Sequence, residues 1–304
     1  KITNFKEIES GISVTGHKIW HKFIWEIMKF DLFQSVSFRK HPVKFLFAKF
    51  LMRSHLSTFF LINRQTYFLK FYPSSYSRAL WIEPNFRLDQ ENFYLEYLKK
   101  GDVVIDIGAN IGTITITSAM QVKNPGTVYS IEAHPKIFEY LKGNVKHNNL
   151  TNVNLFNYAV GNKSGNVFFS NLSSDGQNKI IDHDQGTKIP LIKIDDLNIP
   201  ESNIHLLKID VEGYEKFAFL GSNNVLKKTS CVLFEAVPKN FENYNYSFTD
   251  IYHILNSYNF KIYRFLEHKK ISLISHDYIP QNEDLIAIKN PDDFIDRTNY
   301  EIIN

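Results

Sequence analysis

Four acidic residues stand at the carboxyl ends of apolar segments that the sequence predicts to be successive strands. These residues are Asp106, Glu132, Asp210 and Glu235. In an open α/β sheet, ligands bind in the crevice outside the carboxyl ends of the strands. A single acid at a strand end could be a helix cap, but four converging on one crevice indicate a site. We therefore expect these carboxylates to surround a bound ligand.

The first of these acids precedes a glycine-containing turn. Val103–Ile107 favours a buried strand, and Gly108 and Gly112 allow positive φ and close approach of a ligand to the backbone. The following helix would direct free N–H groups at that ligand, which suggests a nucleotide-like cofactor. Asn110 stands where a dinucleotide fingerprint would have a glycine, and the Asp106 carboxylate would repel a pyrophosphate. The turn thus favours S-adenosylmethionine, which carries an ammonium group and no phosphate, over NAD.

Glu132 follows Gly108 by 24 residues, close to the spacing at which a ribose-binding acid follows the first glycine loop of a nucleotide-binding unit. A carboxylate there can accept hydrogen bonds from both ribose hydroxyls. The alternative is a cap for the helix predicted to begin at Pro135.

Methyl transfer to an alcohol benefits from a general base, and Asp210 and Glu212 are the candidates. Two residues apart on an extended backbone, their side chains would lie on one side, where nearby carboxylates raise each other's pKa. We rank Asp210 first as base and Glu212 second, with Glu235 as a third catalytic carboxylate. Two alternatives stay open: Glu212 caps the next helix while Lys208 neutralises the pair, or Asp210, Glu212 and Glu235 hold Mg²⁺. Metal-free chemistry is favoured.

These motifs resemble the FkbM family of methyltransferases over roughly residues 75–240. The matching blocks are 104–112, 131–135, 207–215 and 234–235. The resemblance implies a class I methyltransferase fold and S-adenosylmethionine-dependent O-methylation of a hydroxyl on a sugar, glycolipid or related natural product. By position, it also assigns the cofactor site. Asp106, Gly108, Asn110 and Gly112 would line the methionine end, Glu132 would hold the ribose, and Ala159 and Val160 would lie near the adenine.

The elements that must position these residues follow from the hydrophobic pattern. From Val103 onward strands and helices alternate, which predicts a Rossmann-like, doubly wound, mostly parallel sheet. The expected strands include 153–160, and the last one is placed at 285–289. Residues 1–80 are predicted to form a helical and β-hairpin extension, and residues 81–304 the methyltransferase domain. The polar segments 74–78 and 173–178 are candidate acceptor contacts.

Residues 1–60 combine helical apolar spacing with many basic and aromatic side chains. One interpretation is a surface that contacts a membrane or a lipid-linked substrate. The other, favoured because amphipathic helices usually pack on a domain, is a set of packed helices with solvated lysines.

Composition limits the remaining function classes. The net charge of +3 on 304 residues gives no indication of nucleic-acid binding, and no apolar segment reaches the length of a membrane span. The single Cys231 excludes an internal disulfide and fits a reducing compartment, so we expect a cytoplasmic enzyme with a small-molecule or glycan acceptor. The oligomeric state is left open. Alternatives are an NAD(P)-dependent oxidoreductase and an inactive cofactor-fold module associated with membranes.

Overall fold

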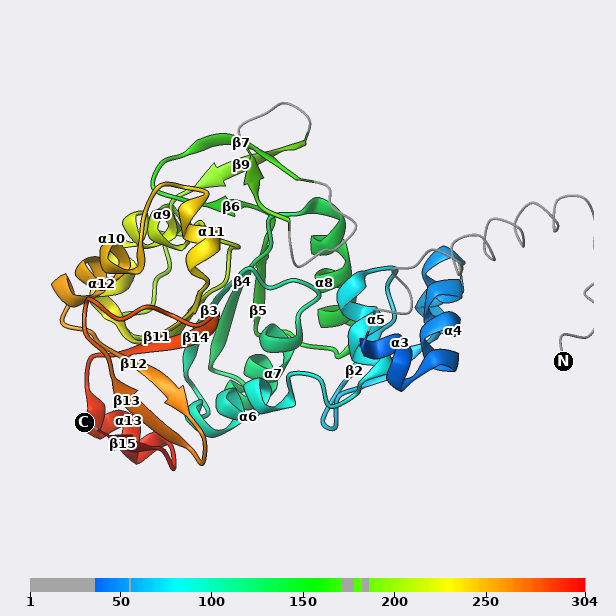
Figure 1. Cartoon of the computed structure of the whole chain (residues 1–304), viewed down its shortest axis with the longest axis horizontal. Coiled ribbons are helices and arrows are strands. Elements are labelled where there is room, and N and C mark those ends of the chain that lie inside the picture. Colours follow the sequence, from blue (N-terminus) through cyan, green and yellow to red (C-terminus); the bar gives the residue numbers. More distant parts are fainter. Residues whose placement is uncertain (1–35, 55, 171–177, 182–185, 304) are drawn as a thin grey trace, which may run out of the picture.

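The computed structural model describes residues 36–54, 56–170, 178–181 and 186–303 (Figure 1). Its largest part is a nine-stranded sheet with the order β15-β13-β12-β14-β11-β10-β3-β4-β5. The strands of its parallel half are β3 (Val103–Ile107), β4 (Thr127–Ile131), β5 (Val153–Phe156), β10 (Ile204–Ile209) and β11 (Thr229–Ala236). The other half consists of β12 (Lys261–Leu266), β13 (Lys270–Leu273), β14 (Glu283–Ile288) and β15 (Glu301–Ile303).

The order of these strands is that of a class I methyltransferase fold, as predicted. Strands β5, β4, β3, β10 and β11 run parallel, and β14 is inserted antiparallel between β11 and β12. Successive strands are added to one side of β3 as far as β5, and the chain then returns to the other side of β3 with β10, so the strand order reverses between β3 and β10. In a doubly wound sheet, ligands bind outside the carboxyl ends of the strands at this reversal.

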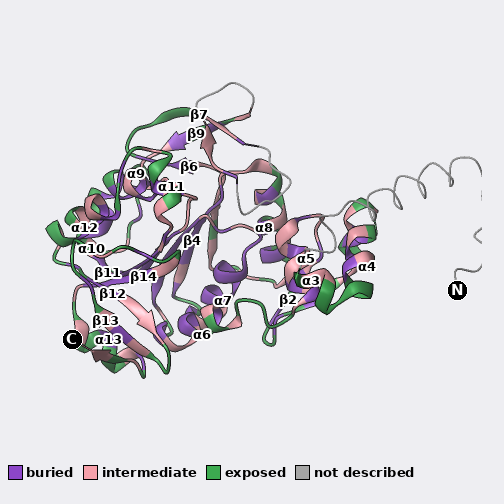
Figure 2. Ribbon diagram, viewed as in Figure 1, coloured by how far each residue is buried: buried purple, intermediate pink, exposed green. Residues whose placement is uncertain are grey.

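Helices cover both faces of the sheet, and its central strands are therefore buried on both sides (Figure 2). One face packs against α9 (Glu215–Leu220), α10 (Asn223–Lys228) and α12 (Phe248–Ser257). The other packs against α6 (Leu88–Tyr97), α7 (Thr113–Val122) and α13 (Pro291–Arg297). The chain also contains α8 (Pro135–His147), η4 (Ile194–Leu197) and α11 (Pro238–Glu242).

A second, four-stranded sheet has the order β6-β9-β7-β8. Its strands are β6 (Ala159–Val160), β7 (Gly165–Phe169), β8 (Ile180–Ile181) and β9 (Thr187–Ile192). The single strand predicted at 153–160 is therefore wrong, since the structure divides it between the two sheets. The Asn157 side-chain amide donates to the Glu132 and Ala133 carbonyls at 2.8 and 3.0 Å, which fixes the segment between β5 and β6 to the residues that follow β4.

Residues 36–82 form a lobe beside α8 (Figure 1). It contains α3 (Val36–Lys40), α4 (Pro42–Arg53), η2 (Ser57–Phe59), α5 (Ser75–Ile82) and the hairpin of β1 (Leu61–Asn63) and β2 (Phe68–Lys70). One hydrophobic cluster joins Leu51 and Leu69 of the lobe to Ile116 of α7 and Leu141 of α8. The boundary predicted at residue 80 lies inside α5, and the core is continuous across it.

The predicted N-terminal helices are only partly covered by the structure. Residues 1–35 lie outside the described part of the chain, while α3 and α4 occupy positions where helix was predicted. Within the residues that the structure describes, no helix is both long and apolar enough to cross a membrane.

Candidate active site

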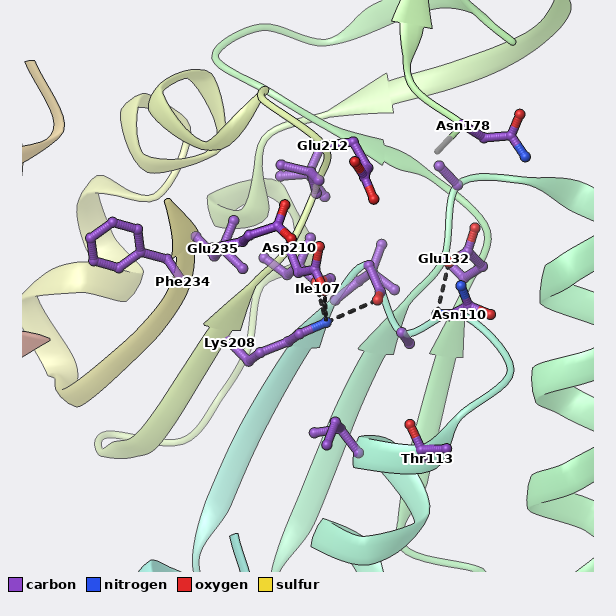
Figure 3. A pocket seen from close by; sticks show the side chains of 18 of the residues that line it. Ile107, Asn110, Thr113, Glu132, Asn178, Lys208, Asp210, Glu212, Phe234 and Glu235 are labelled. Carbon is purple, nitrogen blue, oxygen red and sulfur yellow. Dashed lines mark hydrogen bonds and ion pairs between the residues drawn. The ribbon is translucent and has the colours of Figure 1, made fainter. Parts of the chain in front are cut away.

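A cavity of about 480 Å³ opens at the carboxyl ends of β3, β4, β10 and β11 (Figure 3). Most of the predicted site residues line it: Gly108, Asn110, Glu132, Ala159, Val160, Asp210, Glu212 and Glu235. Asp106 and Gly112 lie outside its lining. The volume lies within the range of pockets that enclose a small organic molecule.

The turn after β3 brings the backbone of two strands into close contact. Gly108 has φ of +76°, and a Cβ at this position would lie 1.8 Å from the Asp210 carbonyl oxygen. A side chain therefore has no room where β3 and β10 leave the sheet. Asn110 also has positive φ, and its side-chain oxygen accepts a hydrogen bond from the Ile111 N–H at 2.8 Å, which stabilises a conformation that asparagine tolerates.

Gly112 acts behind the cavity. It precedes α7 with φ of +97°, and a Cβ there would lie 2.7 Å from Leu141 Cδ1. Its lack of a side chain lets α8 pack closely against the turn.

Glu132 follows β4 and is held by two backbone donors. Its Oε2 accepts from the Asn110 N–H at 2.9 Å and its Oε1 from the His134 N–H at 2.8 Å. Burial raises the pKa of this carboxyl to about 7, although both N–H groups oppose the shift. The helix-cap role belongs to His134, whose Nδ1 accepts from the Lys136 N–H. Because a carboxylate offers about four acceptor positions, Glu132 keeps capacity for two hydroxyls.

Asp106 is fully buried on the α7 side of β3. Its Oδ2 accepts from Thr115 Oγ1 at 2.6 Å, and its Oδ1 lies 3.5 Å from the ammonium of Lys208, its register partner on β10. The Asp106 carboxylate thus faces the Lys208 ammonium, not the cavity. Asp106 would affect a bound ligand only indirectly, by positioning Lys208.

Lys208 lines the cavity, which the sequence analysis considered only as a neutralising charge. Its Nζ donates to the Gly108 carbonyl at 3.0 Å. The same ammonium lies 3.3 Å from Asp210 Oδ2 (Figure 3). Burial lowers its pKa, but Asp210 and Asp106 more than offset this and hold the pKa above its ordinary value. A permanent cation therefore connects the glycine turn to the predicted base.

The segment after β10 carries Asp210 and Glu212 into the cavity. Glu212 has φ of +54°, and its Oε2 accepts from the Asn240 side chain at 3.4 Å. The alternative cap role of Glu212 is performed by Glu215, whose Oε1 accepts from the N–H groups of Val211 and Gly213, both at 3.1 Å. Glu212 is therefore left directed into the site.

Asp210, Glu212 and Glu235 form a carboxylate cluster, with one oxygen from each lying within 4.8 Å of the others. Burial, followed by the charges of Asp210 and Glu212, raises the pKa of Glu235 to about 9. Burial and Asp210 raise the pKa of Glu212 to about 7. Glu235 accordingly keeps its proton at neutral pH. The same oxygens could also surround a hard cation, so the Mg²⁺ alternative stays open.

The cavity lining also includes Arg87, Gln90, Tyr94 and Asp284, which the sequence analysis did not name. Asp284 is the register partner of Glu235 on β14, and Gln90 Nε2 donates to its Oδ2. Because β14 runs antiparallel, its amino end lies at the same edge as the carboxyl ends of the parallel strands. The sequence signal for this residue was the acidic pair Glu283 and Asp284 before Leu285. Placing that pair at the cavity would have required knowing that β14 runs antiparallel to its neighbours.

Part of the cavity lining is apolar and aromatic. It includes the buried Ala159 and Val160 and the partly buried Tyr158, Phe169 and Tyr214. Their assignment to the adenine stays a prediction. Of the polar segments proposed to contact the acceptor, Ser75, Tyr76 and Asn178 line the cavity, whereas 173–177 lies outside the described residues.

The strand order, the glycine turn after β3 and the acid after β4 define a class I methyltransferase fold with its ligand cavity. The family model for the methyltransferase FkbM domain matches residues 106–262, just over half of the chain. The chain therefore belongs to the FkbM methyltransferase family, as the sequence motifs predict.

Known proteins similar to this chain include hexuronic acid methyltransferase AglP of Haloferax volcanii. The two are 29% identical over 164 residues, which cover 51% of this chain and 65% of the relative. The chain thus matches slightly less than two thirds of that relative's length.

Two solved structures have low overall similarity to the chain. Methyltransferase FkbM from Methylobacillus flagellatus has a TM-score of 0.43 at 14% identity and covers 83% of this chain and 59% of its own. A SAM-dependent O-methyltransferase from Thermotoga maritima has a TM-score of 0.38 at 12% identity, with coverages of 66% and 64%. The fold assignment rests on the strand order.

Proposed function

We propose that this protein is an S-adenosylmethionine-dependent O-methyltransferase that acts on a hydroxyl of a sugar, glycolipid or related natural product. The observation that carries this proposal is the convergence of Asp210, Glu212 and Glu235 in the same cavity as the Gly108 turn and Glu132. Family membership supports methyl transfer over the NAD(P) alternative. The retained carboxylates argue against an inactive binding module.

The chain's own residues fit the proposed cofactor. Gly108 leaves the turn open against the Asp210 backbone, Glu132 presents acceptor oxygens to a diol, and Ala159 and Val160 offer an apolar surface. Gly108, Asn110, Glu132, Ala159 and Val160 would hold the molecule, with Lys208 and Asp106 behind its methionine end. S-adenosylmethionine, when bound, supplies an electrophilic sulfonium methyl group.

The carboxylate cluster divides the acid–base work. Asp210, placed by the Lys208 ammonium, accepts the proton of the acceptor hydroxyl as the oxygen becomes nucleophilic. Glu235 is protonated at neutral pH because its pKa is about 9, so it can donate a hydrogen bond within the cluster. Glu212, with a pKa of about 7, is the second base candidate.

The acceptor end favours an alcohol over an acid. Asp210, Glu212, Glu235 and Asp284 surround it, and burial together with Asp210 also raises the pKa of Asp284. An additional carboxylate on the acceptor would meet like charges, whereas neutral hydroxyls can hydrogen-bond to several carboxyl groups. Similarity to a hexuronic acid methyltransferase supports a sugar acceptor. A hexuronic acid carries a carboxyl group, whereas the acidic acceptor end of this chain favours a neutral sugar. The buried Cys231 thiol supports a cytoplasmic location.

Methyl transfer from labelled cofactor to a panel of sugars, glycolipids and small alcohols tests the proposal. Replacement of Asp210 by Asn should lower kcat by about 10²–10⁴-fold on the best acceptor, because the proton loses its carboxylate base. S-adenosylhomocysteine should still raise the melting temperature of this variant.

Full activity of Asp210→Asn would remove Asp210 as the base. If S-adenosylhomocysteine leaves the melting temperature of the unsubstituted protein unchanged while NAD raises it, the methyltransferase proposal fails.

A further inference from the structure

Helix α4 carries two apolar faces, and only one of them is buried. Phe45, Ala48 and Leu51 face the core of the lobe. Val43, Phe47 and Phe50 repeat at helical spacing on another face and are 80%, 39% and 51% exposed. Apolar side chains at this spacing form a continuous stripe along the helix, and an exposed stripe of this kind marks an interaction surface.

The exposed stripe is supported by aromatic packing. The Phe47 ring lies 5.6 Å from the Phe60 ring, 5.7 Å from Trp81 and 6.3 Å from Phe50. Phe59, at the end of η2, is also strongly exposed. These contacts hold part of the stripe in place without covering it.

The charged side chains of the segment 36–82 have one sign. The segment contains no Asp or Glu, and apart from the buried Arg64, which pairs with Glu91, its basic residues are Arg39, Lys40, Lys44, Lys49, Arg53, Lys70 and Arg78. At 100° per residue, Lys44 lies to one side of the stripe and Lys49 and Arg53 to the other. Because the whole chain has a net charge of only +3, this basic character is concentrated in the lobe.

We propose that this face of the lobe, formed by Val43, Phe47 and Phe50 with their basic neighbours, docks on the surface of an anionic phospholipid bilayer. The apolar side chains enter the interface while the flanking cations contact lipid headgroups. A helix of 12 residues that also packs on a core is suited to lie on a bilayer, not to cross it.

Docking would place α5, which contributes to the wall of the candidate active site, next to the docked helix. Arg78 of α5 lies over the Phe45 ring of α4 at 5.5 Å, and Ser75, Tyr76 and Ala79 of α5 line the cavity. The docked helix therefore adjoins a wall of the site. A glycolipid acceptor in the bilayer would then lie close to the site, and this consequence rests on the proposed function. The docking itself does not rest on it.

Co-sedimentation of the full chain with vesicles tests docking independently of methyl transfer. Vesicles of phosphatidylcholine with about 30% phosphatidylserine should bind the protein at least ~10-fold better than pure phosphatidylcholine, and high salt should weaken the binding. The double variant Val43→Ser with Phe50→Ser should lose at least ~10-fold in binding.

A matched control is Leu273→Ser with Ile279→Ser, which alters side chains that are 46% and 71% exposed on the opposite part of the molecule. It should bind vesicles like the unsubstituted protein. Both double variants should keep the melting temperature, because all four side chains are exposed.

Three results would overturn the proposal. The first is no binding to the anionic vesicles at low salt, and the second is equal binding by the Val43→Ser with Phe50→Ser variant. The third is coverage of the α4 face without lipid, either in a dimer that this variant dissociates or in a monomer in which hydroxyl-radical footprinting finds Phe47 and Phe50 protected. Failure of methyl transfer would leave the vesicle result unaffected.

Discussion

Gly108 is the residue on which the geometry of the site depends most directly. It lies where β3 and β10 approach each other at the reversal of the sheet, with the Asp210 carbonyl oxygen in the place that a Cβ would occupy. The same close approach allows Lys208 to reach the Gly108 carbonyl and the Asp210 carboxylate together. Because Gly108 has no side chain, the turn, the Lys208 ammonium and Asp210 can lie in contact with one another.

Gly108→Ala should therefore destabilise the protein by about 3 kcal/mol or more, because it combines a steric overlap with a positive φ. It should also weaken S-adenosylhomocysteine binding at least ~10-fold, as the turn moves away from Asp210. Urea denaturation and calorimetric titration measure these effects.

Gly165→Ala provides the control, since a Cβ at Gly165 would meet no atom within 4 Å. Its effect should stay within about 1 kcal/mol. Unchanged stability and ligand affinity of Gly108→Ala would contradict this account of the turn.

The elements of the lobe are attached to the methyltransferase domain by a buried ion pair. Arg64, which follows β1, donates to Glu91 of α6 and to the carbonyls of Pro84 and Phe86. Glu91 Oε2 also accepts from Tyr67 and Thr117 at 2.9 and 3.2 Å. The hairpin and α6 are therefore joined by a polar network inside an apolar core.

Glu91→Ala should lower the free energy of unfolding by about 3–5 kcal/mol, because it leaves the Arg64 guanidinium buried without its anion. Addition of Arg64→Met to this variant should recover part of the loss. Glu139→Ala, which breaks the exposed pair with Lys142, should change it by less than about 0.5 kcal/mol. Equal effects of Glu91→Ala and Glu139→Ala in urea denaturation would show that the network contributes little.

Not every element was predictable from its own residues. The helix predicted to begin at Pro135 is confirmed, because proline at the first helical position and an amphipathic pattern are local signals. Strand β13 was not predicted, and neither were α13 and β15, which lie beyond residue 289, where the sheet was expected to end. Short edge elements such as β15 depend on pairing with a neighbour that is distant in sequence.

At the scale of the whole molecule, folding buries several carboxyl groups at the site, and this burial disfavours their ionised form. Burial raises the pKa of Glu132, Glu212 and Glu215 to about 7 and that of Glu235 to about 9, against an ordinary value of 4.5. The folded protein therefore binds more protons than the unfolded chain between these values. As pH rises through this window, the free energy of unfolding must fall.

The ligand-free protein should consequently lose about 2–6 °C of melting temperature between about pH 7 and pH 9, with Glu235 as the principal cause. His205 does not titrate in this range, because burial lowers its pKa. Glu235→Gln should give a flatter profile, since the amide carries no titrating proton. A melting temperature that rises across this range, or an unchanged slope in Glu235→Gln, would contradict the assignment.

The sequence by itself determined the local features of this protein. The apolar run before Asp106, the spacing of Gly108 and Gly112, and the acids that follow predicted strands were sufficient to predict the fold class, the family and the edge of the sheet that carries the site. These features are readable because strand burial, positive φ and helix starts depend on neighbouring residues.

Only the tertiary structure decided how the acidic residues are used. The parallel register of β3 and β10 directs Asp106 to Lys208, and the antiparallel insertion of β14 places Asp284 opposite Glu235. Arg64, which lies in the predicted hairpin extension, is buried because Glu91 of α6 pairs with it. Strand order, strand direction and register bring together residues far apart in sequence, so no local pattern specifies these contacts.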